Sequence, residues 1–347
     1  MSIYNATSLA NLDDFGKCEI VEGTGEILED TSGSGKSRPW SQHKMENLLL
    51  VQLFEIARLA DSEVISDSRL ENLRNCASWL WFALLASGRK KLVKANFCRL
   101  RLCPMCAWRR ALKLFAQVSA ITDAIMADKP DVRFIFVTFT IRNVSASALR
   151  DTIKRMNLGF KYLTQDKAKM PVSKVLRRNL LGYMKAIEVT YNVRRDDYHP
   201  HIHCIFEVAP TYFEGKEHGY ISQLEWRQMW QSVMKLDYLP QVNVRAVDSD
   251  ARPKAVAELA KYPVKMSGLL KIRSKKKAAR ALIELKRAIH NCRFITFGGD
   301  FKEYKKRLEL DDVENGDLTH IETDKKTLNA VAIMLYKYRA DAGAYIC

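Results

Sequence analysis

The stretch His199–Phe206 (His-Pro-His-Ile-His-Cys-Ile-Phe) decides how the rest of this chain is interpreted. From His201 onward polar and apolar residues alternate, which is the period-two pattern of a half-buried β-strand. In such a strand His201 and His203 point to one face of a sheet. Two neighbouring imidazoles can hold a divalent metal ion, whereas a single histidine would simply belong to a polar strand face. We therefore predict a metal site at His201 and His203, with His199 as a further candidate ligand whose direction depends on Pro200.

The strands around this motif supply a third candidate ligand. Residues 133–141 are rich in β-branched and aromatic residues and predict a central strand. Residues 182–191 predict a second strand that forms an antiparallel hairpin with the metal strand at 201–208. Glu188 lies on that second strand, thirteen residues before His201. Hard ions such as Mg²⁺ or Mn²⁺ prefer a carboxylate ligand, so Glu188 is either the third ligand or an ordinary surface residue of an alternating strand.

Three cysteines form a second candidate metal cluster. Cys98, Cys103 and Cys106 have the spacing Cys-x4-Cys-x2-Cys, and tetrahedral Zn²⁺ binds four such thiolates in structural sites. The alternatives are buried free thiols and a redox pair, and no thioredoxin-like pattern surrounds the motif. Residues 89–113 contain nine Lys or Arg and no acid, so zinc could anchor a basic segment against DNA. The candidate DNA contacts in this segment are Arg99, Arg101, Arg109 and Arg110.

The net charge of +16 is unevenly distributed. Residues 1–40 carry seven acids and three bases, are rich in Gly and Ser, and predict a flexible acidic tail. Residues 252–287 hold twelve Lys or Arg against two Glu, and Lys261 among them is a further candidate DNA contact. Such an excess of positive charge favours a polyanionic partner, although anionic lipid and simple solubility are alternatives.

The chain shows no feature of export or of a membrane protein. It has no run of roughly 20 apolar residues and no basic-then-apolar leader. Its eight cysteines are then expected to be reduced or metal-bound, so we predict a cytoplasmic protein without a membrane partner.

The remaining periodicity outlines the scaffold. Residues 43–87 have helical periodicity and predict a helical block, and 146–166, 222–234 and 277–291 predict further helices. Residues 241–247 and 330–338 predict strands. Ser249 or Asp250 can cap a helix that runs through Tyr262.

Taken together, these segments resemble the HUH endonucleases, and in particular the rolling-circle replication initiators of small bacterial plasmids. His201-Ile202-His203 is similar to their His-hydrophobe-His motif. Residues 136–143 resemble the strand before the metal strand, and residues 188–192 followed by 198–201 resemble the metal segment. Residues 258–265 (Glu-Leu-Ala-Lys-Tyr-Pro-Val-Lys) resemble the nucleophile segment. The match extends over roughly residues 75–320, and its motifs are specific jointly rather than singly.

The resemblance implies roles for individual residues. Tyr262 would be the nucleophile, and Glu258, one helical turn earlier, would activate water or a second strand end to terminate the reaction. Lys265 would hold the phosphate or neutralise charge. Glu188 would be the acidic metal ligand, and Cys76 would be the fourth zinc ligand.

One residue departs from what a continuous helix requires. Pro263 disfavours a helical conformation at Tyr262, so the helix is expected to kink or end there. Tyr191 and Tyr198 lie near the metal motif and are alternative nucleophiles.

The expected fold is α+β: an HUH-type central antiparallel sheet with flanking helices, plus a helical zinc-binding N-terminal module. The expected division is a tail at 1–40, a basic zinc module at 41–128, the endonuclease at 129–275, and C-terminal elements packed on the nuclease at 276–347.

The expected function is metal-dependent nicking and strand transfer at a plasmid double-strand origin through a 5′-phosphotyrosine. The expected partners are origin DNA, a host helicase and a DNA polymerase, with a homodimer allowed. A single-strand transposase or a relaxase would share the active site, and a zinc-dependent DNA-binding regulator would leave the DNA intact.

Overall fold

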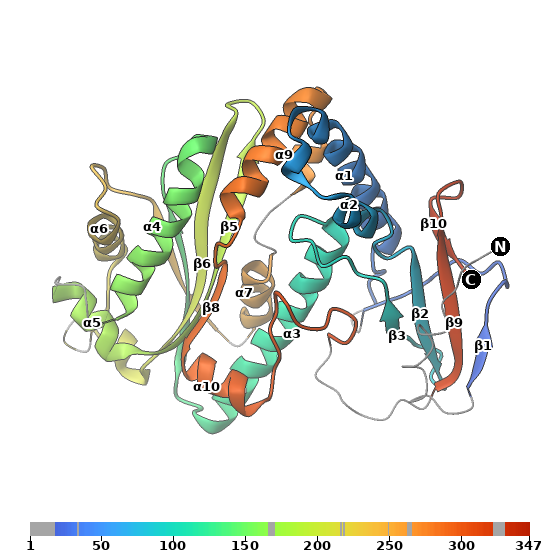
Figure 1. The fold of residues 1–347 in the computed structure, drawn as a ribbon. Helices are drawn as coiled ribbons and strands as arrows, with labels where there is room; N and C mark the ends of the chain where they lie inside the picture. Colours follow the sequence, from blue (N-terminus) through green and yellow to red (C-terminus); the bar gives the residue numbers. More distant parts are fainter. Residues whose placement is uncertain are drawn as a thin grey trace.

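The computed structural model shows two β-sheets joined by helices (Figure 1). It describes residues 18–32, 35–165, 171–215, 217, 219–248, 250–261, 266–321 and 330–347. In this part of the chain no helix is long and apolar enough to cross a membrane. The fold is α+β, as the sequence predicts.

The larger sheet has five strands in the order β7-β4-β6-β5-β8, and all neighbours in it are antiparallel. Its strands are β4 (Arg133–Thr140), β5 (Leu180–Asn192), β6 (Asp197–Val208), β7 (Val242–Val247) and β8 (Ile295–Gly299). The predicted strands at 133–141, 182–191, 201–208 and 241–247 are confirmed by the first four of these, and β5 and β6 form the predicted hairpin.

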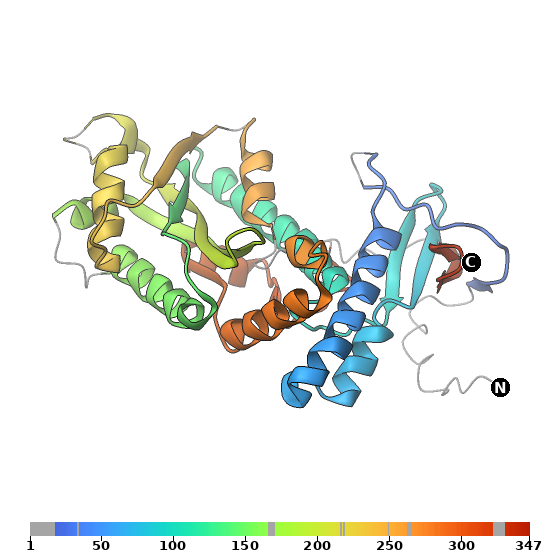
Figure 2. The ribbon, with the colours of Figure 1, turned by 90° about the horizontal axis from the view of Figure 1, so that it is seen from above.

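Helices cover both faces of this sheet (Figures 1 and 2). One face carries α4 (Ala146–Thr164), α5 (Pro171–Asn179) and α6 (Gln223–Met234), and the other carries α3 (Pro104–Asp128), α7 (Arg252–Leu259) and α10 (Asp300–Arg307). A single-turn 3-10 helix, η4 (Pro210–Phe213), follows β6. The helices predicted at 146–166 and 222–234 are confirmed by α4 and α6.

Aromatic side chains hold the α4 face together. Phe139 of β4 and Phe206 of β6 pack against Phe160 of α4 and against Trp226 and Trp230 of α6, all of them buried. Burying side chains of this size stabilises a fold by about 1.5–3 kcal/mol each. Alternation along β6 therefore places its even-numbered residues in this core and its odd-numbered residues on the opposite face.

The smaller sheet joins the two ends of the chain. Its strands are β1 (Glu19–Val21), β2 (Trp79–Leu85), β3 (Lys90–Ala95), β9 (Ala330–Arg339) and β10 (Ala344–Ile346). The order is β1-β9-β2-β3, and β10 pairs with β9. Helices α1 (Trp40–Ala60) and α2 (Asp67–Arg74), with the 3-10 helix η3 (Ser62–Val64) between them, lie beside this sheet. The short α8 (Met266–Leu270) precedes α9 (Lys275–Ile289), which packs against both α1 and α4 and so connects the two halves.

Three expectations are corrected here. The helical block predicted at 43–87 ends with α2, and its last part is strand β2, because a short buried apolar run has no period that separates helix from strand. Residues 1–40, predicted as a tail, contain β1, which pairs with β9. Strands β9 and β10 complete the smaller sheet, whereas β8 and α10 pack on the larger one, so residues 276–347 are shared between the two.

Candidate metal centres

The predicted metal ligands converge on the α7 side of the larger sheet. Glu188 on β5 lies directly opposite His201 on β6, and His203 follows two residues later on the same face. Glu188 Oε2 lies 3.3 Å from His201 Nε2 and 3.2 Å from His203 Nε2. One ligand atom from each of the three residues lies within 4.8 Å of the other two. The hairpin register, rather than any local motif, brings the carboxylate to the imidazoles.

The surroundings fix the orientation of these rings. Thr138 on β4 pairs with His203, and its Oγ1 lies 3.1 Å from His203 Nδ1, which leaves Nε2 directed at the carboxylate. The ring of Phe136 packs 5.7 Å from the His203 ring. A hydrogen bond to the second imidazole nitrogen orients metal-binding histidines in many proteins. Thr138 is a residue that sequence reasoning missed, since its role depends on strand register.

His199 lies beside the cluster but outside it. Its ring stacks on His201 with 5.1 Å between centroids, and the three-residue cluster does not include it. Burial and the neighbouring His201 lower the pKa of His199, so its imidazole is neutral at neutral pH. The His199 ring is therefore an uncharged group stacked on His201.

The donor set fits a divalent ion that keeps open positions. Neighbouring ligands of a six-coordinate ion at about 2.1 Å lie about 3 Å apart, close to the separations between Glu188 Oε2 and the two imidazoles. Two imidazoles and one carboxylate suit first-row transition ions such as Mn²⁺, and the carboxylate also suits Mg²⁺. Three protein donors leave room for water and a substrate oxygen.

Glu258 of α7 lies over the same face. It accepts a hydrogen bond from Arg245 of β7 at 2.8 Å, and the Arg245 guanidinium lies 4.5 Å from the centre of the Phe136 ring. Partial burial acts to raise the pKa of Glu258, but the hydrogen bond and charge of Arg245, together with His203 and Lys261, lower it below the usual value. Glu258 is thus held as a carboxylate. Arg245 is a second residue that sequence reasoning missed.

The predicted helix through Tyr262 is shorter than expected, because α7 ends at Leu259. Tyr262 and Lys265 lie outside the described residues, as does Pro263. Lys261 is exposed just beyond the helix.

The two alternative nucleophiles are both engaged elsewhere. Tyr198 is fully buried, and its hydroxyl donates to the carbonyl oxygen of Ala281 in α9 at 3.2 Å. The hydroxyl of Tyr191 donates to Asp196. Burial raises the pKa of both phenols, as do the carboxylates of Glu284 beside Tyr198 and Asp196 beside Tyr191, and this makes each a poorer nucleophile.

The four predicted zinc ligands form a second compact cluster. Cys76 Sγ lies 3.6 Å from both Cys103 Sγ and Cys106 Sγ, and Cys98 Sγ lies 3.7 Å from Cys106 Sγ. Four thiolates at 2.3 Å from one ion lie about 3.8 Å apart at tetrahedral angles, so this donor set fits a closed tetrahedral site. Cys76 follows α2, and Cys106 lies in the first turn of α3.

Three of the predicted DNA-binding arginines serve the fold instead. Arg109 and Arg110 are buried in α3 and donate to backbone carbonyl oxygens, Arg109 to Leu318 and Thr319. Arg101 donates to the carbonyl oxygens of Ile289 and Cys292 and pairs with Glu314. These guanidinium groups are committed to protein oxygens, so the prediction that they contact DNA is not supported by their placement. Arg99 and Lys261 are exposed, so for these two residues DNA contact stays a prediction.

Comparison with known proteins decides the family. Residues 89–346 match the family described as "Replication protein". The chain belongs to the replication protein family. Curated members include a "Protein rep" of Streptococcus pneumoniae, 35% identical over 313 residues that span 90% of this chain and 92% of the relative.

A second member of the replication protein family, a "Protein rep" of Bacillus amyloliquefaciens, is 36% identical over 336 residues, covering 89% of this chain and 94% of its own. No solved structure gives a significant match. The resemblance of the sequence to replication initiators is thereby confirmed.

Proposed function

We propose that this replication protein initiates plasmid rolling-circle replication by nicking one DNA strand at the double-strand origin and later rejoining it. The convergence of Glu188, His201 and His203 beneath Glu258 carries the proposal. Membership of the replication protein family supports it. The five-stranded antiparallel sheet with two histidines on its central strand agrees with the HUH-type architecture expected for such an enzyme.

Glu188, His201 and His203 would hold Mg²⁺ or Mn²⁺. When bound, such an ion would act as a Lewis acid toward the scissile phosphate. Thr138 keeps the His203 ring in the orientation that directs Nε2 into the site. His199 would shield one side of His201 without serving as a ligand.

Tyr262 is the proposed nucleophile. Its phenolic oxygen would form a bond to phosphorus as the bond from phosphorus to the 3′-oxygen breaks, and that oxygen would leave with a proton as a free 3′-hydroxyl. The 5′ end would remain on the enzyme as a phosphotyrosine, which conserves the phosphodiester for later transfer. Lys265 would neutralise charge on the phosphate.

Glu258 would act at the end of the cycle. Arg245 holds its side chain as a carboxylate over the metal face, and a carboxylate can accept a proton from water or from a second 3′-hydroxyl. A proton acceptor at this position would release the enzyme from the DNA.

The cysteine cluster would hold structural Zn²⁺ and stabilise the unit formed by α1, α2 and the smaller sheet, beside a nuclease unit built on the larger sheet. Origin DNA would contact exposed basic residues such as Arg99 and Lys261. A host helicase and a DNA polymerase would extend the free 3′ end, and a homodimer could engage both strands.

The proposal is tested by incubating the protein with supercoiled origin plasmid and Mn²⁺ or Mg²⁺. We expect a relaxed nicked product and a nucleotide adduct that maps to Tyr262 by mass spectrometry. Tyr262→Phe should abolish the adduct, and the matched control Tyr191→Phe should retain it. Intact DNA under all metal conditions would refute the proposal and indicate a DNA-binding regulator, while an adduct on another tyrosine would overturn the assignment of the nucleophile alone.

A further inference from the structure

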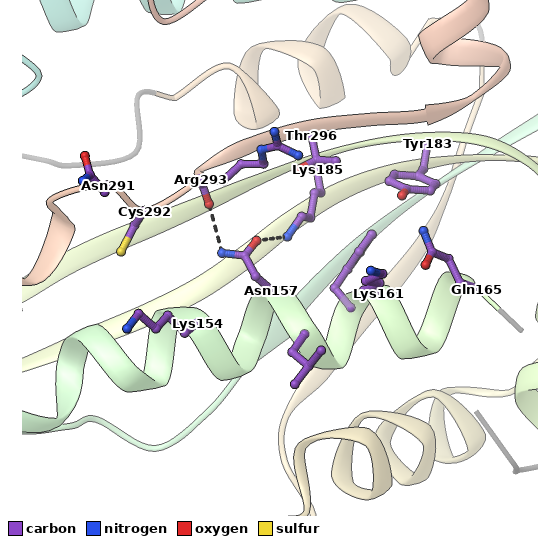
Figure 3. Close-up of a pocket in the computed structure, with 12 residues that line it drawn as sticks. Lys154, Asn157, Lys161, Gln165, Tyr183, Lys185, Asn291, Cys292, Arg293 and Thr296 are labelled. Atoms are coloured by element: carbon purple, nitrogen blue, oxygen red, sulfur yellow. Dashed lines mark hydrogen bonds between the residues drawn. The ribbon is translucent and has the colours of Figure 1, made fainter. Parts of the chain in front are cut away.

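A cavity of about 540 Å³ lies on the face of the larger sheet opposite the metal ligands (Figure 3). It opens between α4 and the strands β5 and β8, with residues 291–293 at one end. Lys185 of β5 pairs with Cys204 of β6, one position away from the pair formed by Ala186 and His203, so its side chain projects away from the candidate metal ligands. The cavity is therefore separate from the proposed active site.

The lining of this cavity is strongly cationic. Four of its twelve lining residues are Lys or Arg, and none is acidic. The remaining lining residues include amide, hydroxyl and aromatic groups that suit a polar ligand with a flat ring. The four cations are Lys154, Lys161, Lys185 and Arg293.

Lys185 is the most unusual of these cations, because its side chain is buried with only 3% of the residue exposed. Its Nζ donates to Asn157 Oδ1, and Asn157 Nδ2 donates to the carbonyl oxygen of Arg293 at 3.0 Å (Figure 3). Among the described residues Asn157 is the one side chain that hydrogen-bonds Lys185 Nζ, which also lies 4.8 Å from the centre of the Phe160 ring. An ammonium group has three N–H donors. Burying a cation without an anion is costly, and a bound anion would offset that cost and keep the lysine protonated.

Burial lowers the pKa of Lys185 to about 7. The neighbouring thiols and phenol are neutral at this pH, because burial raises the pKa of Cys204, Cys292 and Tyr183. Lys185 is then the group around this cavity that changes charge near neutral pH. The titratable and charged groups that face it are Lys154 and Lys161 from α4, Tyr183 from its own strand, Cys204 from β6, and Cys292 and Arg293 from the segment before β8.

The aromatic ring of Tyr183 also lines the cavity that holds these cations. The ring of Tyr183 lies against Gly298 of β8, and a Cβ at Gly298 would fall 2.3 Å from Tyr183 Cζ. Glycine is therefore required for Tyr183 to keep this position. Tyr183 also packs edge-on against Phe160, with 5.2 Å between the ring centroids. Aromatic side chains next to lysines are a recurring arrangement in single-strand nucleic-acid sites.

We propose that this cavity binds a phosphate group of a nucleotide, with the phosphate on Lys185, Lys161 and Arg293 and the base or sugar against Tyr183. A cavity of this size can enclose one nucleotide. Single-stranded DNA is the favoured source, and that preference rests on the proposed function. A free nucleotide offers the same chemistry, so the test separates the two.

The test is isothermal titration calorimetry on the full chain without added divalent metal. The probes are 5′-phosphorylated tetrathymidylate, thymidine 5′-monophosphate and inorganic phosphate. Lys185→Met removes the ammonium and keeps most of the length of the side chain, and we expect it to weaken nucleotide binding by about ten- to a hundredfold. Lys302→Gln, at an exposed position of α10 on the other face, is the matched control and should bind like the wild type.

The pH dependence gives an independent readout. Because the free lysine loses its proton above about pH 7, wild-type affinity should fall by up to about tenfold per pH unit above that point. Lys185→Met should lose this dependence. Tight tetranucleotide binding with weak mononucleotide binding would identify a DNA strand, whereas equal affinities per phosphate would identify a free nucleotide.

Equal nucleotide binding by the wild type and Lys185→Met at every pH would overturn the proposal, as would an equal loss in Lys302→Gln. A separate assay of origin nicking distinguishes failure of the proposed cavity from failure of the proposed nicking activity. Failure of this site leaves nicking in place, and absence of nicking leaves the calorimetric result valid. Circular dichroism of Lys185→Met confirms that it is folded, as expected when a buried uncompensated charge is replaced by an apolar chain.

Discussion

The two candidate metal centres differ in how the chain builds them. The cysteine cluster draws four thiols from residues 76–106, around the start of α3, and its donors enclose one point. The Glu188 cluster draws three donors from two paired strands. A closed set of four soft ligands suits an ion that stabilises a fold, whereas three mixed donors leave positions for a substrate. The two donor sets thus differ in donor number and in scaffold, as expected if one ion is structural and the other is catalytic.

The largest effect is expected at the cysteine cluster. Cys103→Ser removes a fully buried ligand, and because structural zinc supplies folding free energy, the N-terminal unit should lose several kcal/mol of stability. The measurements are zinc content by mass spectrometry and thermal unfolding. Cys18→Ser, outside the cluster, is the matched control and should retain zinc and stability. If Cys103→Ser keeps its metal and melts like the wild type, the thiols are only buried side chains and the contrast between the centres fails.

The second effect is expected at the strand-borne cluster. Glu188→Gln keeps the volume of the side chain but removes its charge, so origin nicking should fall about a thousandfold, which corresponds to about 4 kcal/mol. The fold should remain, because the two imidazoles and the strand pairing are retained. Nicking rates with Mn²⁺ and the melting temperature are the two readouts. Thr138→Val should lose only about ten- to a hundredfold, since it acts through His203. Normal nicking by Glu188→Gln would show that this centre is not catalytic.

Sequence alone predicted the local parts of both centres. Alternation around His201 placed the two imidazoles on one strand face, and the cysteine spacing placed three thiols together. The hairpin between β5 and β6 was also predictable, and with it the approach of Glu188. Each of these inferences depends on residues that are near one another in the chain.

The features that sequence did not predict depend on pairing between distant segments. Strand β2 was assigned to a helix because its apolar run carries no period, and its partner β9 lies about 250 residues away. Arg109 and Arg110 were assigned to DNA from charge alone, whereas the residues 314–319 that accept their hydrogen bonds are remote in sequence. The contact of Arg245 with Glu258 similarly requires the register of β7 on β4.

A third effect compares two acids on the same sheet face. Glu207 lies on β6 beyond His203 and is fully buried, with Lys129 Nζ 4.0 Å from its Oε1. Burial and the neighbouring Asp300 outweigh this lysine and raise the pKa of Glu207 to about 8. The folded protein therefore holds a proton that the unfolded chain releases above about pH 4.5, so this group makes stability fall as pH rises from about 4.5 to about 8. Glu207→Gln should remove this slope and stabilise the protein by about 1–3 kcal/mol at alkaline pH.

Urea unfolding at a series of pH values measures the effect of Glu207, and Glu303→Gln on the exposed face of α10 is the control that should keep the slope. A slope unchanged in Glu207→Gln would mean that Glu207 is ionised in the fold. Glu207, proposed to be neutral through burial, would then no longer differ in this way from Glu188, which lies beside two imidazoles.

The smallest effect is expected at His199, which decides how many donors the strand-borne centre has. Its ring stacks on His201 but lies outside the ligand cluster, so His199→Ala should change nicking by no more than about threefold. Mn²⁺ affinity, measured by titration against nicking rate, should be unchanged, while His203→Ala serves as the reference for loss of a true ligand. If His199→Ala weakens Mn²⁺ as strongly as His203→Ala does, His199 is a fourth donor. The centre would then have four donors, like the cysteine cluster, and donor number could no longer explain the proposal that only one of the two centres acts on DNA.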